Sequence, residues 1–348
     1  MSAPGDTPLS APPPPADATY RDTAAAAPAS SPARTGRRRG GDGLPRSRLL
    51  WLALAVVAVL AALPLWLSVY VLGVLTGAYY FGVFAMAWDL LFGFAGEVNF
   101  GPTFLIGLGA YAAALLDANF GLPIPVCVIA GALAAVIGGL LLALPALRLR
   151  GPYFGLVTLV AVLLLQNAIV IFAGLTGGEI GMTVPDVLSI DATTNYWCAL
   201  AFLAVCGGIL TGLSRSAVGL ILQASGQDAT AAQALGFNVV KHKIAAFCVS
   251  AVFSGTAGAM LVFYIGTASV DTVIDLSIDV QVIIAAVLGG RRTILGGALG
   301  AILLIGAAEL LRPLGQLNTF IVAALALAVI LFFPDGILGY ALRRGARE

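Results

Sequence analysis

The chain has 348 residues, of which 60% are apolar and 10% charged, with a formal net charge of +1 at pH 7. With a mean hydropathy of +1.00, this composition excludes a soluble globular protein and predicts an all-α, polytopic membrane protein. All four cysteines lie in apolar runs without a CxxC pair, so we expect no disulfide, no metal site and no cofactor.

Residues 1–48 differ in composition from the rest of the chain. They hold half of the eighteen prolines, among Ala, Ser, Thr and Gly, and are predicted to be a disordered cytoplasmic tail. Arginines at its end resemble the n-region of a signal peptide, and Arg37-Arg38 a twin-arginine signal. We favour an uncleaved first span, because the run 49–67 is long and more spans follow. Residues 49–340 are predicted to be the membrane domain and 341–348 a second cytoplasmic tail.

Ten apolar runs are candidates for membrane helices, which need about 17 to 25 residues to cross. They cover approximately residues 49–67, 70–92, 101–116, 124–146, 152–173, 196–213, 244–265, 277–289, 294–311 and 318–333. The runs 101–116 and 277–289 are short and bordered by glycine, so we expect broken or re-entrant helices there. Small-residue patterns after both breaks are a weak indication of two related halves, 70–173 and 244–333.

Charge placement favours ten spans with both termini in the cytoplasm. In that topology, all but one of the eighteen Lys and Arg residues are cytoplasmic, and only Arg312 lies outside. The outer loops carry Asp117, Glu179, Asp186, Asp191, Asp271, Asp275 and Asp279. A wrong number of crossings would scramble this segregation. The larger outer loops, 174–195 and 266–277, are either a landing surface for an external partner or simple linkers.

The long polar insertion with basic residues, 215–243, is expected on the cytoplasmic side. Asp228 suits a helix N-cap, because its carboxylate accepts free backbone N–H groups, and Gly236 suits the left-handed position after the last turn. The sequence therefore predicts a short helix over 229–235. Such a helix is marginal alone in water, so we interpret it as a packed docking element for another protein.

Polar residues within the apolar runs are candidates for a transport pathway. Glu97 and Asn99 lie in a stretch rich in glycine, and a carboxylate at mid-bilayer costs about 2.5 to 3.5 kcal/mol unless it faces a cavity or a partner. The glycines either expose backbone groups to a ligand or permit close helix packing with Glu97 bonded to neighbouring backbone. For Asp89 and Glu309, nearer the interfaces, a structural role is favoured.

Catalytic motifs are absent from the sequence. It contains no GxxxxGK[ST] loop, no HExxH and no GxSxG. Its single histidine, His242, stands between two lysines at a predicted membrane edge and is interpreted as an interfacial residue. These observations disfavour an intramembrane enzyme. As partners we expect lipid and no nucleic acid.

Residues 93–111 read GFAGEVNFGPTFLIGLGAY. This stretch resembles the signature GYAGQVSLGHAAFFGIGAY of LivM-type permeases of branched-chain amino-acid ABC importers. Further matches follow in family order between residues 70 and 340, at 144–153, 175–178, 231–238, 287–290 and 331–336. No single match is specific to this family, but the combination of matches is.

The resemblance implies a subunit of the bacterial inner membrane with defined partners. These are a second homologous permease, two cytoplasmic ATPases and an external substrate-binding protein. The segment 215–238 then corresponds to the coupling segment that docks in a groove of the ATPase. The implied coupling residues are Gln227, Asp228, Ala231, Ala232, Gln233, Leu235 and Gly236, and the implied pathway residues are Gly96, Glu97, Asn99, Gly101 and Tyr111.

The chain departs from the family pattern in the signature stretch 93–111 and in the coupling segment. Glu97, Asn99 and Pro102 replace the Gln, Ser and His of the signature. In the coupling segment 226–236 only Asp228 is ionised, so docking is expected to depend on shape and apolar contact.

The resemblance favours branched-chain or related amino acids as the substrate, and urea, short amides and small carboxylates are alternatives. Two other classes stay open. One is a stand-alone proton-coupled carrier that uses Asp89, Glu97 and Glu309. The other is a structural or regulatory subunit that acts through its basic tail.

Overall fold

The computed structural model describes residues 55–146 and 153–315, with isolated residues up to 336. The chain divides into two units, Met1–Asp42 and Gly43–Glu348, and all described residues belong to the second. The predictions for the tails 1–48 and 341–348, for the start of the first run and for most of the run 318–333 lie outside the described residues.

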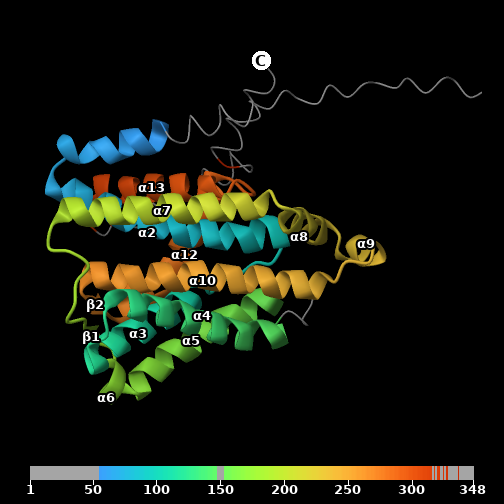
Figure 1. Cartoon of the computed structure of the whole chain (residues 1–348), viewed down its shortest axis with the longest axis horizontal. Coiled ribbons are helices and arrows are strands. Elements are labelled where there is room, and N and C mark those ends of the chain that lie inside the picture. Colours follow the sequence, from blue (N-terminus) through green and yellow to red (C-terminus); the bar gives the residue numbers. More distant parts are fainter. Residues whose placement is uncertain are drawn as a thin grey trace, which may run out of the picture. The chain divides into compact units, whose positions relative to one another are not determined.

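The described residues form a helical bundle (Figure 1). Two-residue strands β1 (Met182–Thr183) and β2 (Thr267–Ala268) pair antiparallel and join the two larger loops, a small exception to the all-α prediction. A π-helical segment, Leu90–Ala95, follows α2 directly. The helices are α2 (Val69–Asp89), α3 (Pro102–Phe120), α4 (Ile124–Ala146), α5 (Tyr153–Ile171), α6 (Ala173–Thr176), α7 (Ala192–Ser214), α8 (Ala217–Gln227), α9 (Ala229–Ala234), α10 (Val239–Ile265), α11 (Val270–Val273), α12 (Leu276–Gly289) and α13 (Leu295–Leu310).

Seven helical segments of the described part are long and apolar enough to cross a membrane. Two shorter apolar helices, Ala55–Leu65 and Leu295–Leu310, accompany them, and the protein is a multi-pass membrane protein. The run 101–116, expected to be short, extends into the 19 residues of α3, and the run 277–289 joins α11 in a 20-residue candidate, Val270–Gly289. The total of ten spans stays a prediction.

Close backbone contacts between small residues hold α10 in the bundle. In Figure 1, α10 runs between α2 on one side and α3 and α4 on the other, and it packs against all three. A Cβ on Gly109 of α3 would lie 2.2 Å from the carbonyl oxygen of Gly255, and one on Gly258 would lie 2.3 Å from that of Ile106. Such approaches are how membrane helices gain van der Waals contact without a hydrophobic driving force.

Two buried aspartates cap helix starts in the opposite half of the domain. Asp89, at the end of α2, accepts the backbone N–H groups of Arg292 and Ile294, both at 3.1 Å, just before α13. Asp279 of α12 accepts the N–H of Thr103, in the first turn of α3, at 2.7 Å. This exchange explains two carboxylates in an apolar core, because each satisfies helix-start donors that lack a partner within their own helix. The structural role favoured for Asp89 agrees with these contacts.

Asp89→Ala is expected to destabilise the domain more than Asp89→Asn does. The carboxylate bonds the backbone where Arg292 and Ile294 hold positive φ angles of 63° and 38°, which non-glycine residues adopt only at a cost. Each buried N–H left unbonded costs about 1–3 kcal/mol, and asparagine keeps one acceptor oxygen. Thermal unfolding of the two purified variants in detergent checks this order, and equal unfolding temperatures would contradict it.

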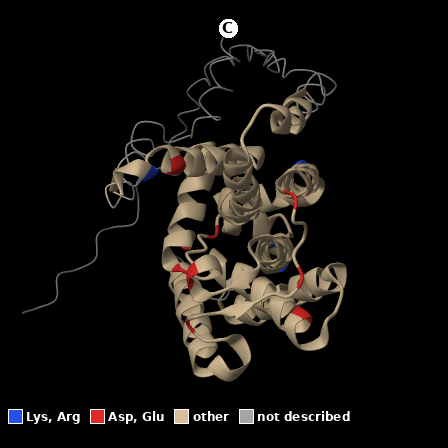
Figure 2. Cartoon of the chain, turned by 90° about the vertical axis from the view of Figure 1, so that its left-hand side faces the viewer, with Lys and Arg blue, Asp and Glu red and all other residues tan. Residues whose placement is uncertain are grey.

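The charges of the described residues separate to the two ends of the bundle, and α8 and α9 lie opposite β1 and β2 (Figure 1). We call the end with α8 and α9 the basic end, because Arg215, Lys241, Lys243, Arg291 and Arg292 lie there. At the other, acidic end, shown in Figure 2, acidic residues predominate among the charged ones, with Glu179, Asp186, Asp191 and Asp271 exposed. After α13 ends at the acidic end, the chain returns, because Gly336 lies against Gly290 at the other end of that helix.

Candidate functional site

The predicted short helix at the basic end is confirmed as α9. One carboxylate oxygen of Asp228 accepts the N–H groups of Thr230 and Ala231, both at 2.9 Å. Gly236 has a φ of 88°, and its N–H donates to Gln233 while that of Phe237 donates to Ala232. This paired closure satisfies the last carbonyl groups of the helix. Both ends of the helix are therefore fixed by residues 228–237 themselves.

The helix α8, which precedes α9, is a feature that the sequence analysis missed. The segment 215–227 reads as a polar insertion, yet Ser216 caps a helix by accepting the N–H of Gly219. Gly219, Leu222 and Ser225 are buried at a spacing of three, so one face of α8 packs on the membrane domain. The serine cap and this spacing were the available signals.

The helix α9 presents an open, mostly uncharged surface. Ala232 is 3% exposed and packs inward, whereas Leu235 is 76% exposed and Phe237 is 39% exposed. Gln227, Asp228, Ala231, Gln233 and Gly236 are exposed as well. A surface of this kind offers apolar contact and amide hydrogen bonds to a partner, in line with the expected mode of docking.

The signature residues form a compact turn between the π-helical segment and α3. Gly96 has a φ of 72°, and the N–H of Glu97 donates to the carbonyl of Leu91. Asn99 is 2% exposed, and its side-chain oxygen accepts the N–H of Gly101 at 2.9 Å. The backbone carbonyl of Asn99 accepts the Trp88 indole N–H at 2.6 Å. We call residues 96–101 the signature loop. Its shape is held by the Asn99–Gly101 bond within the loop and by bonds to Trp88, Leu91 and Thr158 outside it.

The signature loop contacts the segment that carries α9 in two places. A Cβ on Gly226, near the end of α8, would lie 2.5 Å from the carbonyl oxygen of Phe94, and one on Gly96 would lie 2.9 Å from the Gly226 Cα. Lys243 of α10 forms an ion pair with Glu97, with an Nζ–Oε1 distance of 2.5 Å and side chains that are 16% and 18% exposed. The structure thus brings Gly96 and Glu97 of the predicted pathway against the segment that carries α9.

The contacts of the signature glycines favour close packing over an open ligand site. A Cβ on Gly101 would lie 2.3 Å from the carbonyl oxygen of Thr158 in α5. Glu97 has a lysine as its partner, where the packing interpretation expected neighbouring backbone. Tyr111 does not join this region, since it lies ten residues along α3 from Gly101, about 15 Å away. Its buried hydroxyl has no hydrogen-bond partner among the described residues.

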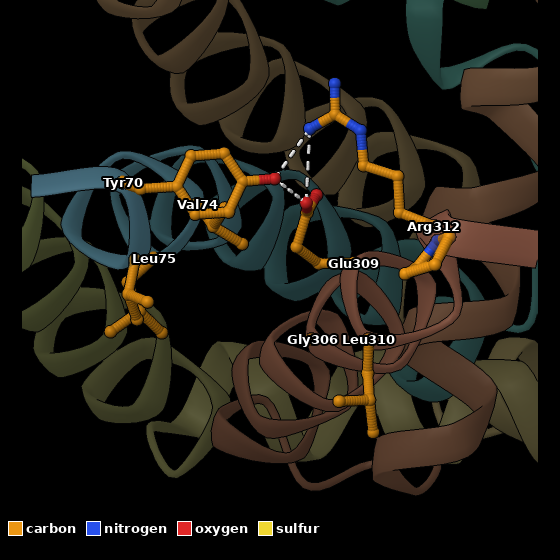
Figure 3. A pocket seen from close by; sticks show the side chains of 9 residues that line it. Tyr70, Val74, Leu75, Gly306, Glu309, Leu310 and Arg312 are labelled. Carbon is orange, nitrogen blue, oxygen red and sulfur yellow. Dashed lines mark hydrogen bonds and ion pairs between the residues drawn. The ribbon is translucent and has the colours of Figure 1, made fainter. Parts of the chain in front are cut away.

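Glu309 lies at the acidic end, in a surface depression of about 670 Å³ between α2 and α13 (Figure 3). Its carboxylate accepts a hydrogen bond from the Tyr70 hydroxyl and pairs with Arg312 at 3.1 Å, and Arg312 also donates to Tyr70 at 2.7 Å. The rest of the lining is mainly aliphatic. Glu309 therefore has a local structural role, as its position near an interface suggested.

The carboxylates proposed for a proton relay do not form a chain. Asp89 bonds the backbone before α13 at the basic end, and Glu309 lies near the other end of α13. The 15 residues from Ile294 to Glu309 correspond to about 22 Å of helix. Glu97 is held by Lys243. This separation disfavours the stand-alone proton-coupled carrier.

Comparisons with known proteins agree with this geometry. Residues 70–334 match the family model described as "Branched-chain amino acid transport system / permease component". The chain is 26% identical over 327 residues to the high-affinity branched-chain amino acid transport system permease protein LivM of Salmonella typhimurium, covering 84% of this chain and 75% of that protein. The Escherichia coli LivM protein is 27% identical over the same shares.

A second group of relatives carries another name. The chain is 28% identical over 248 residues to the autoinducer 2 import system permease protein LsrC of Salmonella paratyphi B, covering 67% of this chain and 68% of that protein. No solved structure matches the chain significantly. Because the family model covers most of the chain, including the signature loop and α9, the protein belongs to the permease-component family of branched-chain amino acid transport systems.

Proposed function

We propose that the chain is the membrane-spanning permease subunit of an ABC importer and that separate ATPase subunits drive it through α9. The observation that supports this most directly is the connection between α9 and the signature loop. The helix α9 is open to a partner on its outer side, and α8 and Lys243 link its segment to the loop before α3. A movement of α9 reaches the membrane helices through these two contacts.

In this proposal the chain lies in the inner membrane of a bacterial cell, and its basic end faces the cytoplasm. The retention of Lys and Arg on the cytoplasmic side supports this orientation. Two ATPases bind at the basic end, a second permease of the family lies beside this chain, and an external binding protein delivers the substrate to the acidic end. The ladder of β1 and β2 there ties the two outer loops into one surface.

The preferred substrates are branched-chain or related amino acids. The LivM relatives, which align with more of the chain than the LsrC relatives, support this class. The LsrC relatives, named as permeases of an autoinducer 2 import system, support autoinducer 2 as a second candidate substrate.

Co-purification from native membranes tests the assembly. The full chain with an affinity tag is expected to retain a second permease and an ATPase with a P-loop. Deletion of residues 229–235 is expected to remove the ATPase and keep the second permease, because α9 packs on the domain only through a small buried face. Retention of the ATPase by the deletion variant would contradict the coupling role proposed for α9.

Asp228→Ala is expected to weaken coupling through the helix cap. Removal of an N-cap side chain costs about 0.5–2 kcal/mol, and this carboxylate bonds two N–H groups of a helix with few other contacts. Asp228→Asn keeps an acceptor and is the matched control. We expect uptake to fall several-fold with alanine and little with asparagine, and equal losses would assign the effect to the charge of Asp228 instead.

A further inference from the structure

Apart from Asn119 at the end of α3, the described membrane helices carry two exposed amide side chains, Asn167 on α5 and Gln281 on α12. Asn167 donates to the carbonyl of Leu163 in its own helix at 2.7 Å, and its side-chain oxygen has no hydrogen bond with the described residues. Its neighbours on the exposed face of α5 are apolar, with Leu163 46% and Leu164 66% exposed. An amide on such a face needs an explanation, because lipid chains offer no hydrogen bond.

The depth of Gln281 follows from its neighbours. Gln166 donates to the carbonyl of Ile274 at 2.9 Å, which fixes the level of α5 at which the chain enters α12. From there α12 runs toward the basic end, and Gln281 lies seven residues farther on, about 10 Å deeper. Gln166 itself lies five residues before the end of α5, so Gln281 lies about 18 Å from that end, within a membrane core about 30 Å thick. The bond of Asp279 to Thr103, two residues earlier on α12, places Gln281 level with the start of α3.

A lipid environment does not suit these side chains. Transfer of an unbonded amide from water to an apolar medium costs about 2–7 kcal/mol. This cost applies in full to Gln281, which has no hydrogen bond with the described residues, and in part to Asn167, whose amide group donates only to Leu163. The outward face of α4 shows what a lipid-facing surface of this chain looks like, with Ile129, Leu133 and Ile137 62%, 58% and 61% exposed and no polar residue between them. The faces around Asn167 and Gln281 therefore contact water, a solute or another protein.

The elements with the exposed amides are those that hold the start of α3. Thr158 of α5 accepts the N–H of Phe100 at 3.0 Å, and Asp279 of α12 accepts the N–H of Thr103 at 2.7 Å. Phe100 itself is 40% exposed. The region from the signature loop to the start of α3, which the Glu97–Lys243 pair connects to the basic end, is thus bonded to both helices that carry the exposed amides, and a shift of the loop moves them.

We propose that Asn167, Gln281 and Phe100 line the translocation pathway, between this chain and the same face of a second permease of the family. This inference rests on the proposed function. The amides bind the polar backbone of the solute, and the Phe100 ring contacts its apolar side chain. Of the nearby carboxylates, Asp279 is completely buried and does not reach this surface, and Glu97 is paired with Lys243. The surface therefore suits a solute without net charge, such as a zwitterionic amino acid.

Thiol labelling of the complete importer tests the exposure to water. The four native cysteines are replaced by alanine, and single cysteines are introduced as Asn167→Cys, Gln281→Cys and, as a lipid-facing control, Ile137→Cys. A charged, membrane-impermeant methanethiosulfonate is expected to react at positions 167 and 281 at least ~10-fold faster than at 137, a difference of about 1.4 kcal/mol in activation free energy. Equal, slow rates at all three positions would place these faces in lipid and overturn the inference.

Uptake measurements separate this inference from the proposed function. Gln281→Leu is expected to lower leucine uptake at least severalfold while the ATPase and the second permease still co-purify, and Ile137→Leu is the control. If the wild type takes up leucine and the Gln281→Leu variant takes it up equally well, the pathway role of these residues is overturned while the proposed importer function stands. Failure of the wild-type importer to take up any amino acid with ATP would count against the proposed substrate, while labelling would still report on the pathway.

Discussion

Gly226→Ala is expected to reduce uptake at least ~10-fold, an effect of about 1.4 kcal/mol on the coupled step. Gly226 lies where α8 meets the π-helical segment before the signature loop. The added methyl group would lie 2.5 Å from the carbonyl oxygen of Phe94 and 3.0 Å from the Ala95 carbonyl carbon, so α8 must move away. Uptake of labelled leucine by membrane vesicles that contain the complete importer measures the loss.

Gly212→Ala in α7 is the matched control, because no atom lies within 4 Å of a Cβ at that position. Alanine raises helix propensity in both helices by up to about 1 kcal/mol, so propensity alone predicts no loss. Stable insertion of both variants shows that they are folded. Full uptake by Gly226→Ala would mean that the contact between α8 and the loop transmits nothing.

Lys243→Glu is expected to abolish most uptake and to lower the stability of the domain. The substitution places two carboxylates together where both side chains are less than one-fifth exposed. Loss of one partner from a buried ion pair costs about 3–5 kcal/mol of stability. Because both side chains are still partly exposed, we expect a loss near the lower end of this range. Uptake and thermal unfolding of the purified importer measure the two effects.

The double variant Lys243→Glu with Glu97→Lys restores the pair with its charges exchanged, and we expect it to recover a large part of both properties. Lys241→Glu, an exposed lysine two residues earlier on the same helix, is the control for charge alone. Similar losses for Lys241→Glu and Lys243→Glu, or no recovery in the double variant, would contradict a specific link between α10 and the signature loop.

Features encoded by neighbouring residues could be predicted from the sequence. Asp228 and Gly236 specified both ends of α9, because caps and left-handed closures depend on residues within a few positions. The long apolar runs likewise predicted α4 and α7 with bounds close to the observed ones. Glycine next to a polar residue marked the break before α3, although the helix that follows proved longer than expected.

Contacts between distant segments were not predictable in the same way. Glu97 and Lys243 are 146 positions apart, and the local sequence gives no sign that one lies against the other. Glu97 was therefore interpreted as a residue facing either a ligand or backbone, and Asp279 was assigned to an outer loop although it is completely buried against α3. Only the packing of α3 against α12 gives that carboxylate its role.

Reconstitution tests the central claim most directly. The purified chain with its co-purifying permease and ATPase is placed in proteoliposomes with the external binding protein, and leucine uptake is measured with ATP or with a proton gradient. We expect uptake with ATP that is lost on deletion of residues 229–235, and none with the gradient alone. Uptake driven by the gradient without ATP, or unchanged uptake by the deletion variant, would contradict an importer driven through α9.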